Sequence, residues 1–327
     1  MRRRDLFGAF CGMALAAPIA TAAQQAGKVW RIGDLYIGTP EVARIYAQAL
    51  ERSLADFGYV QGRNIVLLVR YTGPQREEMQ EAIISLLPQV DLLVVRGNAA
   101  IEARKLAGAV PTVFISIGYP VELGLVQTLP HPGGNMTGIT AEAALETNGK
   151  RLQILKDIVP DLSRVAVLRD IDTRQQAEFE WTALDQAAHD LELTLGFVDI
   201  KSADDLDGAF AGIKRSEAEG LFVTRTNLTY TASKQIADLA LAARLPSCWP
   251  FRESAMAGGL VSYGPDRVAM VRPAAAQIDK IIKGTSPADI PVEQPTVYEL
   301  YINLRTARLL NLTIPPALLA IADEVIE

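Results

Sequence analysis

The sequence predicts an α/β protein made of two doubly wound parallel sheets, and three observations support this fold class. Short runs of valine, isoleucine and leucine alternate with amphipathic helical segments, which is the pattern of parallel strands joined by crossover helices. The alternation completes one set of units before residue 138 and begins again after residue 140. The length of 327 residues is also too great for one small core and suits two lobes.

The first set of units occupies residues 29–118. Apolar residues at helical spacing, closed by Gly58, predict a helix over 41–57, and similar segments follow over 76–87 and 98–107. The strands expected between these helices read VWRIGDLY, NIVLLVRYT, DLLVVRG and PTVFISIG. Ligands of doubly wound sheets bind beyond the carboxyl ends of the strands, so the loops after these strands are the expected contacts.

The second set follows the segment HPGGNMTGIT. Its strands are expected at RVAVLRD, LTLGFVDI, GLFVTRTN and LPSCWPF, and its helices over 147–159, 173–191, 204–217 and 231–244. A strand GGLVSYGPD, a helix over 266–283, a proline-rich stretch, a strand TVYELYIN and a helix over 304–310 are left over after both sheets. Such segments most simply cross between the lobes, so a hinge is expected.

Phosphate and dinucleotide sites are not expected. The segment His131 to Gly138, HPGGNMTG, has the glycines of a phosphate loop, but no Lys-Ser or Lys-Thr follows and it does not lead straight into a helix. The proline followed by two glycines predicts a turn that feeds the first crossover. No Gly-x-Gly-x-x-Gly opens a helix after the first strand, so NAD binding is not expected, and we expect no cofactor.

Charge and residue counts exclude further classes. The net charge is −6 and becomes −8 without residues 1–23, which hold three arginines and one aspartate; an acidic body of this kind argues against a nucleic-acid partner. Cys248 is the single cysteine beyond residue 23, so no internal disulfide is expected there. His131 and His189 are the two histidines, which leaves little for a zinc site or a Ser-His-Asp triad.

Residues 1–23 are expected to be an export signal. A basic start, MRRRD, precedes an uncharged apolar stretch and then small residues, TAAQQ, that suit a peptidase. The paired arginines followed by Leu6 and Phe7 resemble a twin-arginine signal, and the ordinary secretory route is the alternative. An uncleaved anchor is the third interpretation, although the apolar stretch falls short of the ~20 residues that span a bilayer.

Several long strings of the sequence resemble one family, in the same order, from Met1 to Glu327. They include FGYVQGRNI, LPHPGGNMTGIT, KRLQILKDIVP, AGGLVSYGPD and PVEQPTVYELYINLRTARLLNLTIPPALLAIADEVIE, with the leader RRRDLFG. The sequence is therefore similar to the ABC-transporter substrate-binding proteins of the tryptophan/tyrosine-binding type. The resemblance is specific for the family and says little about the ligand.

The resemblance implies a type 1 periplasmic binding fold: two Rossmann-like lobes joined by a three-strand hinge. Lobe 1 would comprise 28–138 with 266–298, and lobe 2 would comprise 141–262 with 303–327. The crossovers would fall near 137–140, 262–265 and 301–303. Hinge closure on a small molecule is a two-state motion that a ligand drives by contacting both lobes.

The implied function is that of a monomeric periplasmic receptor, not an enzyme, which delivers a small organic solute to an ABC permease in the inner membrane. A sensor that presents the solute to a membrane kinase or chemoreceptor is the alternative. An enzyme is a rival from another class, but the paired carboxylates Asp204 with Asp205 and Asp323 with Glu324 suit capping or solvated faces better than acid/base catalysis.

Candidate ligand contacts lie in loops after the strands of both sets. In the first lobe, Asn98 is an expected N-cap whose following amides, at Ala99, Ala100 and Ile101, suit a carboxylate; the alternative is a capped helix with water on those amides. The first-lobe candidates are Tyr36, Thr39, Arg96, Asn98, Ala99, Ser116, Gly118 and Tyr119. The second-lobe candidates are Asp170, Arg225, Asn227, Trp249, Glu253 and Tyr263. Trp249 is alternatively a core residue, and Tyr263 alternatively packs the hinge.

Three positions depart from the family pattern. Many relatives read Gly-Asp-Pro where this sequence has SIGYP, so Tyr119 replaces a carboxylate that suits an ammonium group. Arg96 and Arg225 stand where relatives often carry small or apolar residues. Because arginine binds carboxylates in bidentate fashion, the ligand is expected to be an organic acid, aromatic or not, rather than a zwitterionic amino acid. The alternative is that either arginine is ion-paired or solvated. No metal ligand set is expected.

Overall fold

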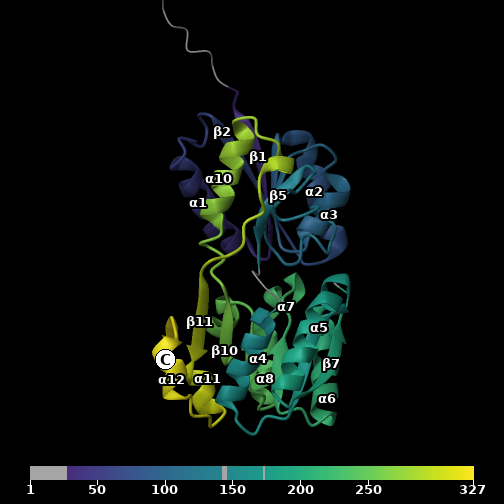
Figure 1. Cartoon of the computed structure of the whole chain (residues 1–327), viewed down its shortest axis with the longest axis vertical. Helices are drawn as coiled ribbons and strands as arrows, with labels where there is room; N and C mark the ends of the chain where they lie inside the picture. The colour runs from purple at the N-terminus through teal and green to yellow at the C-terminus, as the bar shows by residue number, and fades with distance from the viewer. Residues whose placement is uncertain (1–27, 142–145, 172–173) are drawn as a thin grey trace, which may run out of the picture.

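A computed structural model describes residues 28–141, 146–171 and 174–327 of the chain. The expected export signal, residues 1–23, lies outside this part. Two lobes, each with its own sheet, are stacked along the long axis of the molecule, and extended segments connect them (Figure 1). This arrangement confirms the predicted α/β fold class with two lobes.

The first lobe has a five-stranded parallel sheet with the order β2-β1-β3-β4-β5. Helices α1 and α10 pack on one face of this sheet, and α2 and α3 pack on the other. The strands are β1 (Trp30–Ile37), β2 (Ile65–Thr72), β3 (Leu92–Arg96), β4 (Thr112–Ile117) and β5 (Met136–Thr140). The helices are α1 (Pro40–Ala55), α2 (Arg76–Leu86), α3 (Ala99–Leu106) and α10 (Val271–Ile282).

The second lobe has a seven-stranded sheet with the order β12-β11-β10-β9-β8-β6-β7, in which only the β10–β11 pair is antiparallel. The strands are β6 (Arg164–Asp170), β7 (Thr194–Ile200), β8 (Gly220–Val223), β9 (Ser247–Trp249), β10 (Val261–Pro265), β11 (Tyr298–Asn303) and β12 (Glu324–Ile326). The helices are α4 (Glu146–Ile158), α5 (Arg174–Asp190), α6 (Leu206–Arg215), α7 (Asn227–Thr231), α8 (Ser233–Ala242), α9 (Arg252–Met256), α11 (Leu304–Leu309) and α12 (Pro316–Ile321).

The expected helices lie within a few residues of the observed ones, with two instructive differences. The helix expected over 231–244 is interrupted at Ala232, which separates α7 from α8. The helix expected from residue 266 begins only at Val271, because the Asp266 carboxylate accepts the amides of Val268 and Ala269 and holds a turn there. The tail after residue 312, for which no element was assigned, contributes α12 and the edge strand β12.

The segments that pass between the lobes are hydrogen-bonded to one another. The Thr140 amide donates to the Glu293 carbonyl at 2.9 Å, and the Glu293 amide donates to the Gly138 carbonyl at 3.0 Å. Farther along, the Asp266 amide donates to the Val297 carbonyl at 3.2 Å. The passages between the lobes are therefore coupled to one another through backbone hydrogen bonds.

Two of the expected crossovers, near 262–265 and 301–303, lie inside the second sheet. Tyr301 pairs with Ser262 of β10 on one side and with Glu324 of β12 on the other, so residues 301–303 lie inside the second sheet and not between the lobes. The chain reaches the second sheet before this point, at Tyr298, which pairs with Pro265. The chain passes between the lobes after Pro265 and before Tyr298, because β10 pairs over its whole length with β11 in the second sheet.

The segment HPGGNMTG leads from a loop directly into β5. Gly133 has a φ of +70°, a left-handed conformation that favours glycine, and its amide donates to the Ala288 carbonyl. The turn therefore joins the loop before β5 to the chain that returns from α10. Within the described ranges, no helix combines the length and the apolar character needed to cross a bilayer.

Replacing Gly264 by alanine should destabilise the second lobe. A Cβ atom at this position of β10 would collide with the Pro250 carbonyl oxygen, which is backbone and cannot rotate away. We expect the free energy of unfolding to fall by about 1–3 kcal/mol. Urea denaturation measures this, and Gly196→Ala on β7, where a Cβ atom meets nothing within 4 Å, is the control. Equal effects of the two substitutions would contradict the packing argument.

Candidate ligand-binding site

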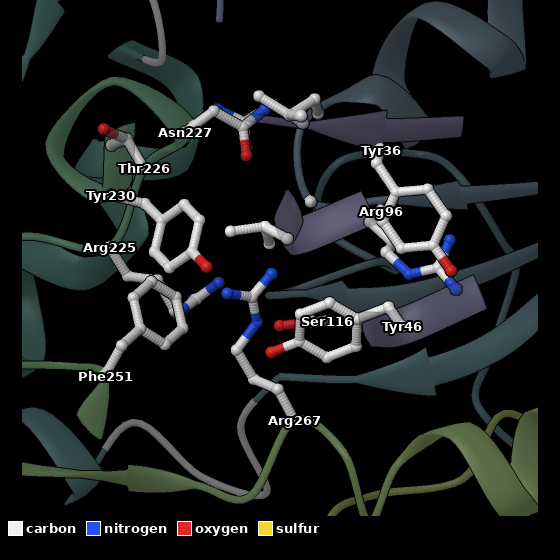
Figure 2. A pocket seen from close by; sticks show the side chains of 14 residues that line it. Tyr36, Tyr46, Arg96, Ser116, Arg225, Thr226, Asn227, Tyr230, Phe251 and Arg267 are labelled. Atoms are coloured by element: carbon white, nitrogen blue, oxygen red, sulfur yellow. The ribbon is translucent and has the colours of Figure 1, made fainter. Parts of the chain in front are cut away.

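A cavity between the lobes is the candidate ligand-binding site. Its empty volume is about 480 Å³, including the part open to solvent. Figure 2 shows side chains from both lobes pointing into it. The lining residues are Tyr36, Ile37, Val42, Tyr46, Arg96, Gly97, Asn98, Ser116, Arg225, Thr226, Asn227, Tyr230, Phe251 and Arg267. Most of them follow the carboxyl ends of parallel strands or begin the next helix, where ligands of such sheets bind.

A buried ion pair organises the first-lobe wall. Asp34 on β1 is fully buried and forms a salt bridge with Arg96, which ends the neighbouring strand β3. The Tyr36 hydroxyl donates to the other Asp34 oxygen, Oδ2, at 2.7 Å, and the Arg96 guanidinium lies 3.8 Å from the Tyr36 ring centroid. Asp34 therefore neutralises Arg96 and also orients the aromatic ring above it.

Burial and charge act on the pKa values of this group. Burial is the main reason that the pKa of the Tyr36 hydroxyl lies well above its ordinary value, and Asp34 adds to the effect. Burial by itself would lower the pKa of Arg96, but the negative charge of Asp34 and the contact with Tyr36 outweigh it, so the pKa of Arg96 is raised. Arg96 therefore stays charged, and Tyr36 stays a neutral hydrogen-bond donor.

Tyr46 connects the lobes. It stands on the buried face of α1, and its ring is stacked on Tyr36 with 6.0 Å between the centroids. Its hydroxyl donates to Glu253 Oε1 of the second lobe at 2.9 Å. This hydrogen bond exists only while the lobes are closed, because its two partners belong to different lobes.

Arg267 lies at the centre of an aromatic cage. It follows β10 on the passage between the lobes, and its guanidinium carbon lies 5.2, 4.4 and 4.9 Å from the ring centroids of Tyr46, Tyr230 and Phe251. Glu253 Oε1 lies 3.9 Å from Arg267 Nη1, an atom that is buried and without a hydrogen-bond partner within the described chain. Burial alone would lower the pKa of Arg267, but its tyrosine and glutamate neighbours outweigh this and raise the pKa, so the cation is retained.

Two second-lobe side chains reach the backbone of the first lobe. The Arg225 guanidinium lies against Gly118, where a Cβ atom would overlap it. The Asn227 amide lies against Gly97 in the same way, and its Nδ2 is 3.7 Å from the Met79 sulfur. Thr226 holds this loop by capping α7 through Thr229. The absence of a side chain at Gly97 and Gly118 thus permits the lobes to approach.

The loop after β4 has an unusual backbone. Ser116 lines the cavity with a φ of +63°, and Tyr119 has a φ of +51°, both in the left-handed region. The register between β4 and β5 shifts between Ile115 and Ile117, so Ser116 forms an irregularity at the strand end. With this backbone, Ser116 lies in the cavity wall. Tyr119 is half-buried and does not line the cavity.

The structure brings many of the expected site residues together. Seven line the cavity or touch a lining side chain across the lobes as expected: Tyr36, Asn98, Ser116, Gly118, Arg225, Asn227 and Glu253. Arg96 also lines it, but in the ion-paired form that was the alternative interpretation. Whether these residues bind a ligand stays a prediction.

Other candidates lie elsewhere. Thr39 is exposed and caps α1 by accepting the Val42 amide. Trp249 is fully buried in the core, where its Nε1 donates to Ser247 Oγ at 2.8 Å, so its core interpretation holds and the expected aromatic wall is wrong. Tyr263 stacks on Tyr298 within the second sheet. These three side chains are used for capping and packing.

The expected anion site at the start of α3 is also absent. Asn98 makes no side-chain cap, and the amides of Ala100 and Ile101 donate to the carbonyls of Gly97 and Asn98. Ala99 is fully buried in the core. Two of the three amides that were expected to be free, those of Ala100 and Ile101, are therefore occupied by a tight first turn.

Asp170 lies in a second hollow between the lobes. This hollow measures about 900 Å³, including open solvent, and shares Asn98 with the cavity. Its rim carries charges of both signs, among them Arg76, Glu102, Lys105 and Lys201. Asp170 therefore lines this second hollow, whose lining does not include the aromatic rings around Arg267.

Tyr46, Tyr230, Phe251 and Arg267 line the cavity but were not predicted from the sequence. Tyr46 belongs to the apolar stripe of the helix predicted over 41–57, Tyr230 lies on α7 just before the helix expected from residue 231, and Phe251 was placed in a strand. Arg267 follows the strand expected to cross between the lobes, and a charged residue at that place was the available signal. Groups of three or more histidine, cysteine, aspartate or glutamate side chains that suit a metal ion do not occur in the described ranges.

Comparison with known proteins identifies the family. The model of ABC transporter substrate binding proteins matches residues 40–326. The chain belongs to this family. A curated relative is the tyrosine-binding protein of Clostridioides difficile strain R20291, which is 22% identical over 265 residues, or 80% of this chain and 75% of the relative. The family assignment made from the sequence is thereby confirmed.

Solved structures share the fold of this substrate-binding protein. A conserved domain protein of Vibrio cholerae O1 biovar El Tor matches with a TM-score of 0.84 and 21% identity, covering 91% of this chain and all of that one. The ABC domain of a Streptococcus pneumoniae protein in complex with L-Trp matches with a TM-score of 0.80 and 20% identity, covering 90% of this chain and all of that one. At these identities the structures support the fold and leave the ligand of this chain open.

Replacing Asp34 by alanine should strongly destabilise the first lobe. The substitution leaves Arg96 buried without its counter-ion, for which we expect a loss of about 3–5 kcal/mol. Asp56→Ala is the control, because Asp56 forms an exposed pair with Arg272 at 3.6 Å and should change stability by less than about 1 kcal/mol. Urea denaturation measures the free energy of unfolding of both variants. A decrease for the Asp34 variant as small as that for the Asp56 variant would contradict the role of Asp34 as the counter-ion of Arg96.

Replacing Tyr46 by phenylalanine should weaken closure. The variant loses the hydrogen bond to Glu253 across the lobes, typically about 0.5–1.5 kcal/mol. We expect a larger mean radius of gyration in small-angle X-ray scattering. Tyr59→Phe is the matched control, because the Tyr59 hydroxyl donates to Asp279 Oδ1 at 2.9 Å within the first lobe. An unchanged radius of gyration in the Tyr46 variant would contradict the role of this hydrogen bond in closure.

Proposed function

We propose that this protein is the solute-binding component of an ABC importer and that it binds a small, carboxylate-bearing organic solute in the cavity between its lobes. The observation that carries the proposal is the position of two arginines. Arg225 and Arg267 both line the cavity, and Arg267 lies between the rings of Tyr230 and Phe251 on one side and Tyr46 on the other (Figure 2). Guanidinium groups bind carboxylates in bidentate fashion, and the rings offer a flat apolar wall.

Contacts between the lobes support a receptor that closes around its solute. Arg225, Asn227 and Glu253 contact the first lobe directly, so each is positioned only in the closed form. A solute that touches both lobes stabilises that form, and the closed protein is the form that an inner-membrane permease would recognise. The tyrosine-binding and L-Trp-bound relatives support a small solute with a carboxylate.

We propose transport, with the protein in the periplasm as a monomer, because the matching family is named for ABC transporters. Export would depend on residues 1–23. Catalysis is not proposed: Asp34 has both oxygens engaged by Arg96 and Tyr36, and Glu253, whose Oε1 contacts Tyr46 and Arg267, does not line the cavity, so neither carboxylate is placed as an acid or base for a solute.

Mass spectrometry of the small molecules that co-purify with the native protein tests this function. We expect a carboxylate-bearing compound that is released on denaturation and that raises the melting temperature when it is added back. A ligand at 100 times its Kd stabilises the native state by about 2.7 kcal/mol, which a thermal-shift assay detects. Turnover of the compound by the protein, or stabilisation by uncharged solutes alone, would contradict the proposal.

A further inference from the structure

Arginine dominates the charged groups of the cavity wall. Among the described residues that line the cavity, three are arginines and none is aspartate or glutamate. The carboxylates of Asp34 and Glu253 do not line the cavity but contact arginines and tyrosines that do. A solute in the cavity therefore meets cationic groups first.

The two nearby carboxylates lie outside the cavity lining, and three of their four oxygens contact protein groups. Asp34 Oδ1 pairs with Arg96, and Asp34 Oδ2 accepts the Tyr36 hydroxyl. Glu253 Oε1 accepts the Tyr46 hydroxyl and faces Arg267, while Glu253 Oε2 is buried and has no hydrogen-bond partner in the part of the chain that the structure describes. An ammonium group would have to compete for three of these oxygens, and the fourth, Glu253 Oε2, is buried on a residue that does not line the cavity.

An added cation is disfavoured at this place. Arg267 keeps its charge in spite of burial, and Glu253 Oε1 lies 3.9 Å from its Nη1. An ammonium beside the Arg267 guanidinium meets like charge in a poorly solvated site, whereas a carboxylate meets opposite charge. The cavity thus separates the two halves of an amino acid, because it suits the carboxylate and opposes the ammonium.

The aromatic side chains of the cavity wall indicate which kind of solute skeleton would fit beyond the carboxylate. Tyr46, Tyr230 and Phe251 surround Arg267, and Tyr230 and Phe251 meet edge to face at 5.5 Å. A planar ring beside Arg267 would stack on the guanidinium or on these rings. Aliphatic acids lack a planar ring and would pack less closely against these side chains.

From these observations we infer that the preferred solute is an aromatic carboxylic acid without an α-amino group, and that Arg267 determines this preference. The inference rests on the proposed function, since it assumes that the cavity is the solute site. It departs from the amino acids named for the relatives.

Matched pairs of ligands test the inference. The pairs are 3-phenylpropanoate with L-phenylalanine, 3-(4-hydroxyphenyl)propanoate with L-tyrosine, and indole-3-propanoate with L-tryptophan. Within a pair the skeleton and carboxylate are the same, and only the α-ammonium differs. Isothermal titration calorimetry at pH 7.5, with protein stripped of ligand by unfolding and refolding, should show each acid that binds to be at least tenfold tighter than its amino acid.

A substitution series locates the preference. In Arg267→Gln the ratio of acid to amino-acid affinity should fall at least fivefold, and Arg267→Lys should retain part of it. The ratio is the readout, because a general folding defect weakens both ligands alike. Arg272→Gln is the control, since Arg272 is an exposed arginine on the following helix, α10, and should leave the ratio unchanged.

Glu253→Gln separates the inference from its rival. If Glu253 accepted an ammonium, the variant would lose affinity for the amino acids alone, which would overturn the inference. We expect instead that the acid and the amino acid of each pair change affinity by the same factor, so that the ratio of their affinities is unchanged.

The failures are distinguishable. Amino acids that bind as tightly as their acids overturn the inference and leave the proposed function standing. Binding of succinate or hexanoate without any aromatic acid overturns the aromatic part alone. Absence of binding by every carboxylate in the set, together with no co-purified acid, overturns both the inference and the proposed function.

Discussion

The buried ion pair between Asp34 and Arg96 is the interaction on which the site depends. It joins the ends of β1 and β3, and it fixes Tyr36 through a hydrogen bond and a stacked guanidinium. Tyr36 supports the ring of Tyr46, whose hydroxyl reaches Glu253 in the other lobe. A charge pair in the first sheet thereby sets the position of a contact that exists only when the lobes are closed.

The same chain of contacts continues to Arg267. Glu253 lies between Tyr46 and Arg267, and Arg267 is enclosed by rings from the two lobes. Arg267 follows β10 on a passage between the lobes, so this charged group of the cavity wall belongs to the hinge itself. Movement of the hinge would therefore displace the cation that we assign to ligand selection, so that closure and ligand contact are one event.

Glycines complete the closed form. Gly97 and Gly118 leave room for Asn227 and Arg225, and larger residues would keep these side chains away from the first lobe. The same absence of a side chain permits close packing at Gly264 within the second lobe. Space, as much as charge, decides which surfaces of the two lobes meet.

Local sequence patterns predicted the sheets and helices well, because hydrophobic periodicity is a local property. They also indicated loops that supply Tyr36, Arg96, Ser116 and Arg225 to the cavity. They failed where a residue had two local interpretations: Trp249 became core because β9 is central in its sheet, and the amides after Asn98 were used by a tight turn. Local patterns also did not predict that β12 pairs with β11, since these two strands are separated along the chain by two helices.

The sequence by itself determined the α/β class, the two lobes and the family to which the chain belongs, because these follow from alternating patterns and long matching strings. Only the tertiary structure decided which charges remain for a ligand. Arg96 was expected to be an anion contact, but Asp34 from the adjacent strand neutralises it, whereas Arg267, 171 positions farther along, enters the cavity among Tyr46, Tyr230 and Phe251. The physical reason is that the electrostatic role of a side chain depends on its neighbours in space, and folding brings these neighbours from distant parts of the chain.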